Sequence, residues 1–101
     1  MEKDLEVHLP LMRVQLHFDV KEEDGRLWFK RYFIEDFPQL PNLYNYIEAA
    51  SLLKGIEENT EILTNLDHRI YFVAQIVWLK DEKGIYPLIV CSEREEASEA
   101  S

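Results

Sequence analysis

Cysteine, glycine and long apolar runs are all scarce in this sequence of 101 residues. The single cysteine, Cys91, has no partner for an internal disulfide and lies in an apolar run, so we expect a buried structural thiol. Only three glycines occur, each at an expected turn or helix end, which excludes a glycine-rich phosphate loop. No apolar run approaches the roughly 20 residues that span a bilayer, and residues 1–4 lack the basic start of a secretory signal. We therefore expect an intracellular, cytoplasmic protein with no membrane contact.

Basic residues are also few, with 11 Lys and Arg against 20 Asp and Glu, for a net charge of −9. Residues 35–67 hold much of the excess, with seven acidic residues and one lysine. Phosphate binding needs clustered Lys and Arg, so nucleic acid is disfavoured as a direct partner. A basic protein surface would complement such a chain. The alternative is that the acidity serves only solubility.

The chain lacks the common signatures of catalytic and metal sites. There is no CxxC, no HExxH and no cluster of His and Cys. His17 and Asp19 lie two residues apart, with His8 nearby if the first segment pairs alongside, but scattered ligands of this kind indicate a metal only weakly. His68 beside Asp67 is typical of a turn, and no nucleophile has an identifiable base and orienting group. We expect neither an enzyme nor a bound metal or cofactor.

Apolar and polar residues alternate over residues 12–20, which predicts a half-buried strand. Asp24-Gly25 then predicts a hairpin turn into a strand over residues 26–34. Lys30 and Arg31 put one charge on each side of that second strand, so the sequence leaves open which side is buried.

The second half of the chain predicts one helix and two or three strands. Asn42 is a suitable N-cap for a helix over residues 43–54, and Gly55 supplies its left-handed stop. The remaining strands are expected over residues 61–66, 69–79 and 85–91, with Pro87 favouring an edge or bulge and a further short strand conceivable over residues 5–9. Together these elements predict an α+β fold, with an antiparallel sheet of four to five strands and one helix packed on one face (ββαββ or ββαβββ). We expect one domain over residues 1–92 and a disordered acidic tail over residues 93–101.

The segment over residues 69–79 is apolar on both alternating faces. One helix covers one face of a sheet, so another molecule or a second sheet is needed to cover the other. We expect that uncovered surface to display aromatic and apolar anchors, namely Trp28, Tyr32, Tyr71, Val73 and Val77. The alternative is that the sheet curls into a small barrel and buries these residues itself.

These observations favour a small acidic protein-binding module. Its best interpretation is an inhibitor, antitoxin or immunity-type protein, or a phage anti-defence protein, that blocks a basic, nucleic-acid-binding protein. The acidic part of its surface would comprise Glu35, Asp36, Glu48, Glu57, Glu58, Glu61 and Asp67. The alternative is a homodimeric structural or assembly subunit that pairs through the apolar sheet face. A dimer that tolerates high salt would favour the alternative, and a monomer that captures a basic partner in a salt-sensitive way would favour the inhibitor.

Overall fold

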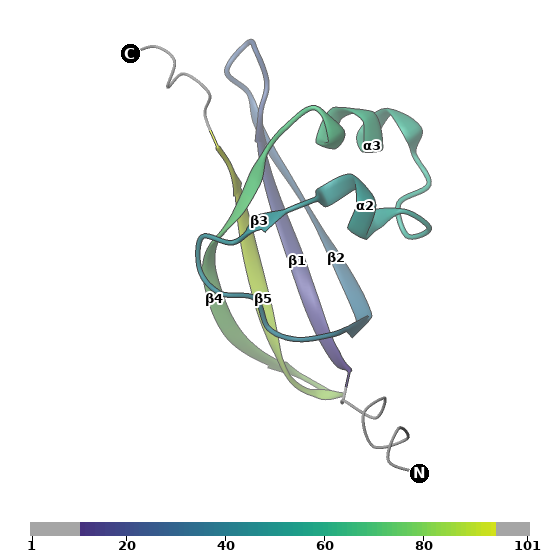
Figure 1. Cartoon of the computed structure of the whole chain (residues 1–101), viewed down its shortest axis with the longest axis vertical. Helices are drawn as coiled ribbons and strands as arrows, with labels where there is room; N and C mark the ends of the chain where they lie inside the picture. Colours follow the sequence, from purple (N-terminus) through teal and green to yellow (C-terminus); the bar gives the residue numbers. More distant parts are fainter. Residues whose placement is uncertain (1–10, 95–101) are drawn as a thin grey trace.

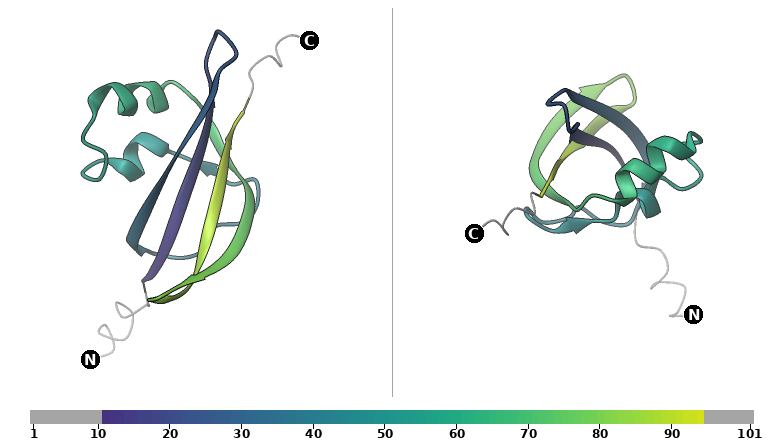
Figure 2. Two further views of the ribbon diagram at one scale, coloured as in Figure 1. Left: turned by 180° about the vertical axis from the view of Figure 1, so that it is seen from behind. Right: turned by 90° about the horizontal axis from the view of Figure 1, so that it is seen from above.

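A computed structural model describes residues 11–94 and has an α+β architecture. Its five-stranded sheet has the order β2-β1-β5-β4-β3 and is mixed, because β1 runs parallel to β5 while the other neighbours are antiparallel (Figure 1). The sheet is strongly curled, and the helices lie on its open side, next to β2 (Figure 2). The elements in chain order are β1 (Met12–Lys21), β2 (Leu27–Phe37), β3 (Tyr46–Ile47), α2 (Ala49–Leu53), α3 (Thr60–Asp67), β4 (Tyr71–Asp81) and β5 (Gly84–Glu93).

The β1–β2 hairpin forms where the sequence predicts it. Gly25 has a positive φ of 92°, and the N–H of Glu22 donates to the carbonyl of Arg26 at 2.7 Å, which closes the turn. The alternate apolar residues of β1 all point to the inner face of the curl and form the centre of the core, namely Val14, Leu16, Phe18 and Val20.

The sequence does not show which side of β2 is buried, and the register of this hairpin answers that question. Tyr32 lies opposite Leu16, and Ile34 lies opposite Val14. Residues directly opposite in an antiparallel pair share a face, so Tyr32 and Ile34 join the core. The prediction that Tyr32 lies on an uncovered surface is therefore wrong. Trp28 shares the inner side at the hairpin end, where it is half-buried and donates its indole N–H to Glu22 Oε2 at 2.5 Å.

A β-bulge in β4 overturns the expected placement of two further anchors. The pairing of β4 with β5 shifts between Val73 and Gln75, which inverts the alternation of faces beyond that point. Tyr71 and Val73 therefore share the inner face with Ile76, and both are 0% exposed in the single chain. The prediction that they line an uncovered surface is wrong, because the curled sheet encloses them. Val77 remains on the outer face and is half-buried.

The predicted helix over residues 43–54 is shorter in the structure. Only α2, residues 49–53, is helical, and residues 46–47 form β3 against β4. Leu53 of α2 is fully buried, and Gly55 follows with a φ of 87°, as the sequence predicts for the stop.

The strand predicted over residues 61–66 is instead the helix α3. The side chain of Asn59 accepts hydrogen bonds from the N–H groups of Glu61 and Ile62, which is an N-cap, and Leu66 is buried against the core. Residues 11–94 therefore contain two short helices rather than the one expected.

Pro87 does not mark an edge, because β5 lies between β1 and β4. The parallel ladder with β1 begins only at Leu88, so Pro87 lies where β5 has no paired neighbour on that side and its missing N–H breaks no bond there.

Cys91 is buried as expected, and burial raises the pKa of its thiol to about 12. Two residues of the predicted tail belong to the fold, since Glu93 ends β5 and the N–H of Arg94 donates to the carbonyl of Ile70 at 2.7 Å. The strand predicted over residues 5–9, His8 and residues 95–101 lie outside the described part.

Candidate protein-binding surface

The acidic residues expected to contact a partner come from separate elements of the fold. They lie in three places: at the end of β2 (Glu35 and Asp36), at the start of α3 (Glu57, Glu58 and Glu61), and beside β3 (Glu48 and Asp67).

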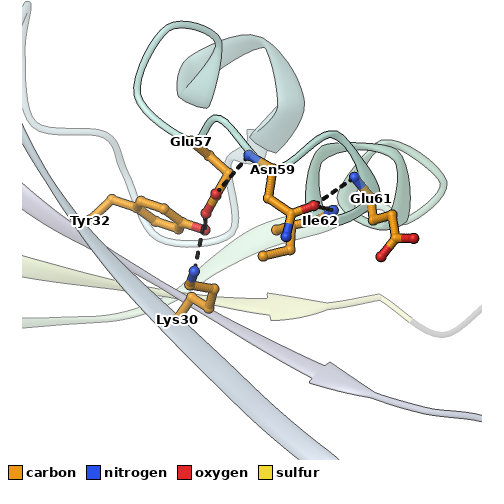
Figure 3. A network of polar contacts seen from close by, with 6 residues as sticks. All are labelled: Lys30, Tyr32, Glu57, Asn59, Glu61 and Ile62. Carbon is orange, nitrogen blue, oxygen red and sulfur yellow. Dashed lines mark hydrogen bonds and ion pairs between the residues drawn. The ribbon is translucent and has the colours of Figure 1, made fainter.

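Glu57 has a structural role inside the molecule. Its Oε1 accepts from the hydroxyl of Tyr32 at 2.6 Å and from Nζ of Lys30 at 3.1 Å, and its Oε2 accepts from the N–H of Asn59 at 3.0 Å (Figure 3). The Tyr32 hydrogen bond is the main cause that lowers the pKa of Glu57 to about 2, with help from Asn59 and Lys30. The side chain is largely covered by its neighbours. This carboxylate therefore joins the helical layer to β2 and is not available to a partner.

Two other acidic residues lie together in a more accessible position. Glu48 precedes α2 and Asp67 ends α3, and both line a cavity of about 140 Å³ next to β3. Arg69 also lines this cavity, but its guanidinium bonds to Asn65 and Glu93, at 2.8 Å each. Within residues 11–94, neither Glu48 nor Asp67 forms an ion pair.

Exposed apolar and aromatic side chains line this cavity or lie in the chain segment just before it. They come from the segment before α2 and from the start of β4, and we call this group the tyrosine surface: Leu43, Tyr44, Tyr46 and Ile70. Tyr44 is 72% exposed and Tyr46 is 65% exposed, although both belong to residue types that normally bury most of their surface. Tyr46 and Ile70 line the cavity with the two acids, so aromatic and acidic groups are adjacent here.

The backbone fixes Tyr44 in an unfavourable conformation. Its φ is 71°, in the left-handed region that a bulky residue rarely adopts. Its N–H donates to the carbonyl of Val73 at 2.7 Å, and its ring stacks on Phe72 with centroids 6.2 Å apart. Strain of this kind persists where the surrounding structure enforces it and clusters at functional sites.

Tyr46 is also held in place. The guanidinium of Arg94 lies 5.7 Å from the centre of its ring, and Arg94 donates a short hydrogen bond to its hydroxyl. Both exposed tyrosines are therefore held in fixed orientations, and a contact made by side chains that are already oriented costs less entropy.

The tyrosine surface was not predicted, because the sequence places residues 43–54, Leu43, Tyr44 and Tyr46 among them, in one helix. A signal for an irregular segment was nevertheless present. Pro41, Asn42 and Asn45 are turn-forming residues, and the N–H of Asn42 donates to Oδ1 of Asn45 at 2.8 Å. This turn replaces the first turn of the expected helix.

The outer face of the sheet carries a second polar cluster, centred on His17. Nε of Arg31 donates to Nδ1 of His17 at 2.9 Å, Nε2 of His17 contacts Asp19 Oδ1 at 2.6 Å, and Phe29 stacks on the imidazole at 4.8 Å. These contacts occupy both ring nitrogens. No group of three metal-binding side chains occurs in the part of the chain that the structure describes. His68 directly follows α3, at its C-cap.

No family model, curated protein or solved structure matches this chain. Among residues 11–94, no helix has the length and apolar character needed to cross a membrane. The arrangement beside β3 combines oriented tyrosines, exposed aliphatic groups and two carboxylates that form no ion pair within residues 11–94. Groups of these kinds can make apolar, hydrogen-bonded and ionic contacts.

Proposed function

We propose that this chain is a small acidic protein-binding module, and that it contacts a basic protein through the tyrosine surface together with Glu48 and Asp67. In this proposal it acts as an inhibitor or immunity-type protein, of the kind that antitoxins and phage anti-defence proteins represent. The partner would be a nucleic-acid-binding protein whose basic surface it occupies.

The observation that carries the proposal is the fixed exposure of two tyrosines, of which Tyr46 lines one cavity with Glu48 and Asp67 and Tyr44 lies two residues before it. Tyrosine supplies a large contact area at a low entropy cost and is enriched among the residues that dominate binding energy. The unpaired carboxylates add charge that attracts a basic partner and speeds its encounter. Glu57 stays outside the contact, because its bonds within the molecule are complete.

The proposal is tested by capture with the full chain as bait in a lysate of its native host. Two site variants remove the two kinds of contact: Tyr44→Ser with Tyr46→Ser, and Glu48→Lys with Asp67→Lys. Matched controls lie at the far end of the sheet, where Ile85 is also exposed and Glu82 lies in the β4–β5 turn: Ile85→Ser and Glu82→Lys.

We expect wild type and both controls to capture the same basic protein, in a complex that weakens as salt rises. We expect each site variant to reduce that capture at least tenfold, or about 1.4 kcal/mol. Retention by both site variants, equal loss in the controls, an acidic captured protein, or no captured protein at all would each refute the proposal.

A further inference from the structure

The cavity next to β3 has acidic residues from two different elements in its wall. Glu48 directly precedes α2 and Asp67 is the last residue of α3, and both line this cavity of about 140 Å³. Neither carboxylate forms an ion pair within residues 11–94. The described part of the chain therefore leaves the negative charge of these two groups uncompensated.

The arginine that lines the same cavity is bonded to other residues. Nε of Arg69 donates to Oδ1 of Asn65, and Nη1 of Arg69 donates to Oε2 of Glu93, at 2.8 Å each. Glu93 thus compensates the charge of Arg69, and the two cavity carboxylates stay unbalanced. The end of α3 adds to the negative potential, because its last turn holds no basic residue and a helix C-terminus attracts cations.

A buried hydroxyl without a partner belongs to a residue of the cavity wall. Tyr71 lines the cavity and is 0% exposed, and its hydroxyl has no hydrogen-bond partner within residues 11–94. A buried polar group in that state costs free energy until it is bonded. The cavity therefore favours a ligand that carries several hydrogen-bond donors.

The remaining walls suit the apolar part of a side chain. Ile70 and Tyr46 are exposed, and both line the cavity together with the half-buried Ile47 and the buried Leu66. A cavity of about 150 Å³ holds a molecule of the size of benzene, which has a similar number of heavy atoms to a guanidinium group with its neighbouring methylenes. The space therefore fits the end of one long side chain.

We propose that this cavity binds an arginine side chain of the basic partner, with the guanidinium between Glu48 and Asp67 and the methylenes on Ile70. The inference rests on the proposed function, since it names the group that the partner inserts. Arginine fits better than lysine, because a planar guanidinium bonds carboxylates through several donors and stacks on an aromatic ring, here that of Tyr46. The ammonium of lysine is a more strongly hydrated point charge. The hydroxyl of Tyr71 is a further acceptor for the guanidinium.

A chemical-shift titration of the isotope-labelled full chain tests the ligand without the partner. The probes are N-acetyl-arginine amide, N-acetyl-lysine amide and N-acetyl-citrulline amide, in which a neutral urea of the same shape replaces the guanidinium. We expect the arginine probe to shift the amide signals of residues 46–50 and 66–71. It should bind about threefold more tightly than the lysine probe and about tenfold more tightly than the citrulline probe.

Three variants test the cavity wall. Glu48→Gln and Asp67→Asn remove one charge each at nearly constant size, and each should weaken binding of the arginine probe about tenfold. Tyr71→Phe removes only the hydroxyl and should weaken it about threefold. Glu82→Gln removes an exposed carboxylate in the β4–β5 turn, so it is the matched control and should bind the probe as wild type does.

Circular dichroism checks that each variant keeps the fold. Equal binding of the arginine and citrulline probes, shifts confined to residues outside the cavity wall, or unchanged binding by the three cavity variants would overturn the proposal. The result is separable from that of the proposed function. Capture of a basic partner by a chain that does not bind the arginine probe would overturn this inference alone, whereas probe binding without any captured partner would support the guanidinium site and refute the proposed function.

Discussion

Replacing Glu57 with glutamine tests how the helical layer is held on the sheet. The substitution keeps the size of the side chain and removes its charge. In the wild type, Oε1 accepts from Tyr32 at 2.6 Å and from Lys30 at 3.1 Å, and Oε2 accepts from the N–H of Asn59. An amide offers one acceptor oxygen for these donors, and its NH2 group would face a donor on the other side.

The expected loss follows from the kind of bond. A hydrogen bond to a charged group contributes about 1.5–3 kcal/mol. The Lys30 pair adds less than about 1 kcal/mol, because the Lys30 side chain is more than one-third exposed and water screens it. We therefore expect Glu57→Gln to lower the free energy of unfolding by about 2–3 kcal/mol, or roughly 10–20 °C in melting temperature for a domain of this size.

The loss should also depend on pH in a defined direction. The pKa of Glu57 falls from an ordinary value of 4.5 to about 2 in the folded protein. A lowered pKa stabilises the fold fully above pH 4.5, and this contribution disappears as the pH falls towards 2. The stability difference between wild type and Glu57→Gln should therefore shrink between pH 5 and pH 3.

Urea denaturation at both pH values, followed by circular dichroism, measures this difference. The matched control is Glu58→Gln, because Glu58 is the exposed neighbour and its change should cost less than about 0.5 kcal/mol. Equal stability of the two variants at pH 7, or a difference between them that does not change from pH 5 to pH 3, would refute the role assigned to Glu57.

Three further substitutions test the core and the strained surface. Tyr71→Phe removes a buried hydroxyl that has no hydrogen-bond partner among residues 11–94, so the melting temperature should stay the same or rise, with a gain of about 1 kcal/mol; a clear fall would show that the hydroxyl is bonded. Leu53→Ala should cost about 2–5 kcal/mol in urea unfolding, because Leu53 is fully buried between helix and sheet, and a cost below about 1 kcal/mol would place it outside the core. Tyr44→Gly relieves the positive φ and should leave stability unchanged or raise it by about 1 kcal/mol while partner capture falls; strong destabilisation would make Tyr44 a structural residue.

The first hairpin could be predicted from sequence because its signals are local. The alternation over β1 and the turn at Asp24-Gly25 each act within a few residues, and the structure agrees with both. The stop at Gly55 belongs to the same class, since it depends on one backbone conformation.

The burial of Tyr32, Tyr71 and Val73 could not be predicted in the same way. The register of β2 against β1 buries Tyr32, and the bulge in β4 buries Tyr71 and Val73. A register and a bulge are properties of a pair of strands, so the sequence of one strand alone does not predict them. The curl of the sheet then closes a core that a flat sheet with one helix would leave open, as the alternative interpretation of the sequence expected.

The helical segment was mispredicted for a related reason. The spacing of apolar residues over residues 43–54 fits one helix, but it also fits the observed short strand β3 followed by the short helix α2. The turn at Asn42 and Asn45 favours the observed arrangement. This difference matters for the site, because Tyr46, which the predicted helix would contain, instead lies in β3, exposed and in one cavity with Glu48 and Asp67.

Hydrogen exchange of the chain, with and without its captured partner, tests the central claim most directly, since it reports which backbone segments the partner covers. The account predicts slower exchange over residues 43–48 and 69–72 in the complex, with β2 unchanged. Protection confined to the outer face of β1, β2 and β5, with none around β3, would contradict it.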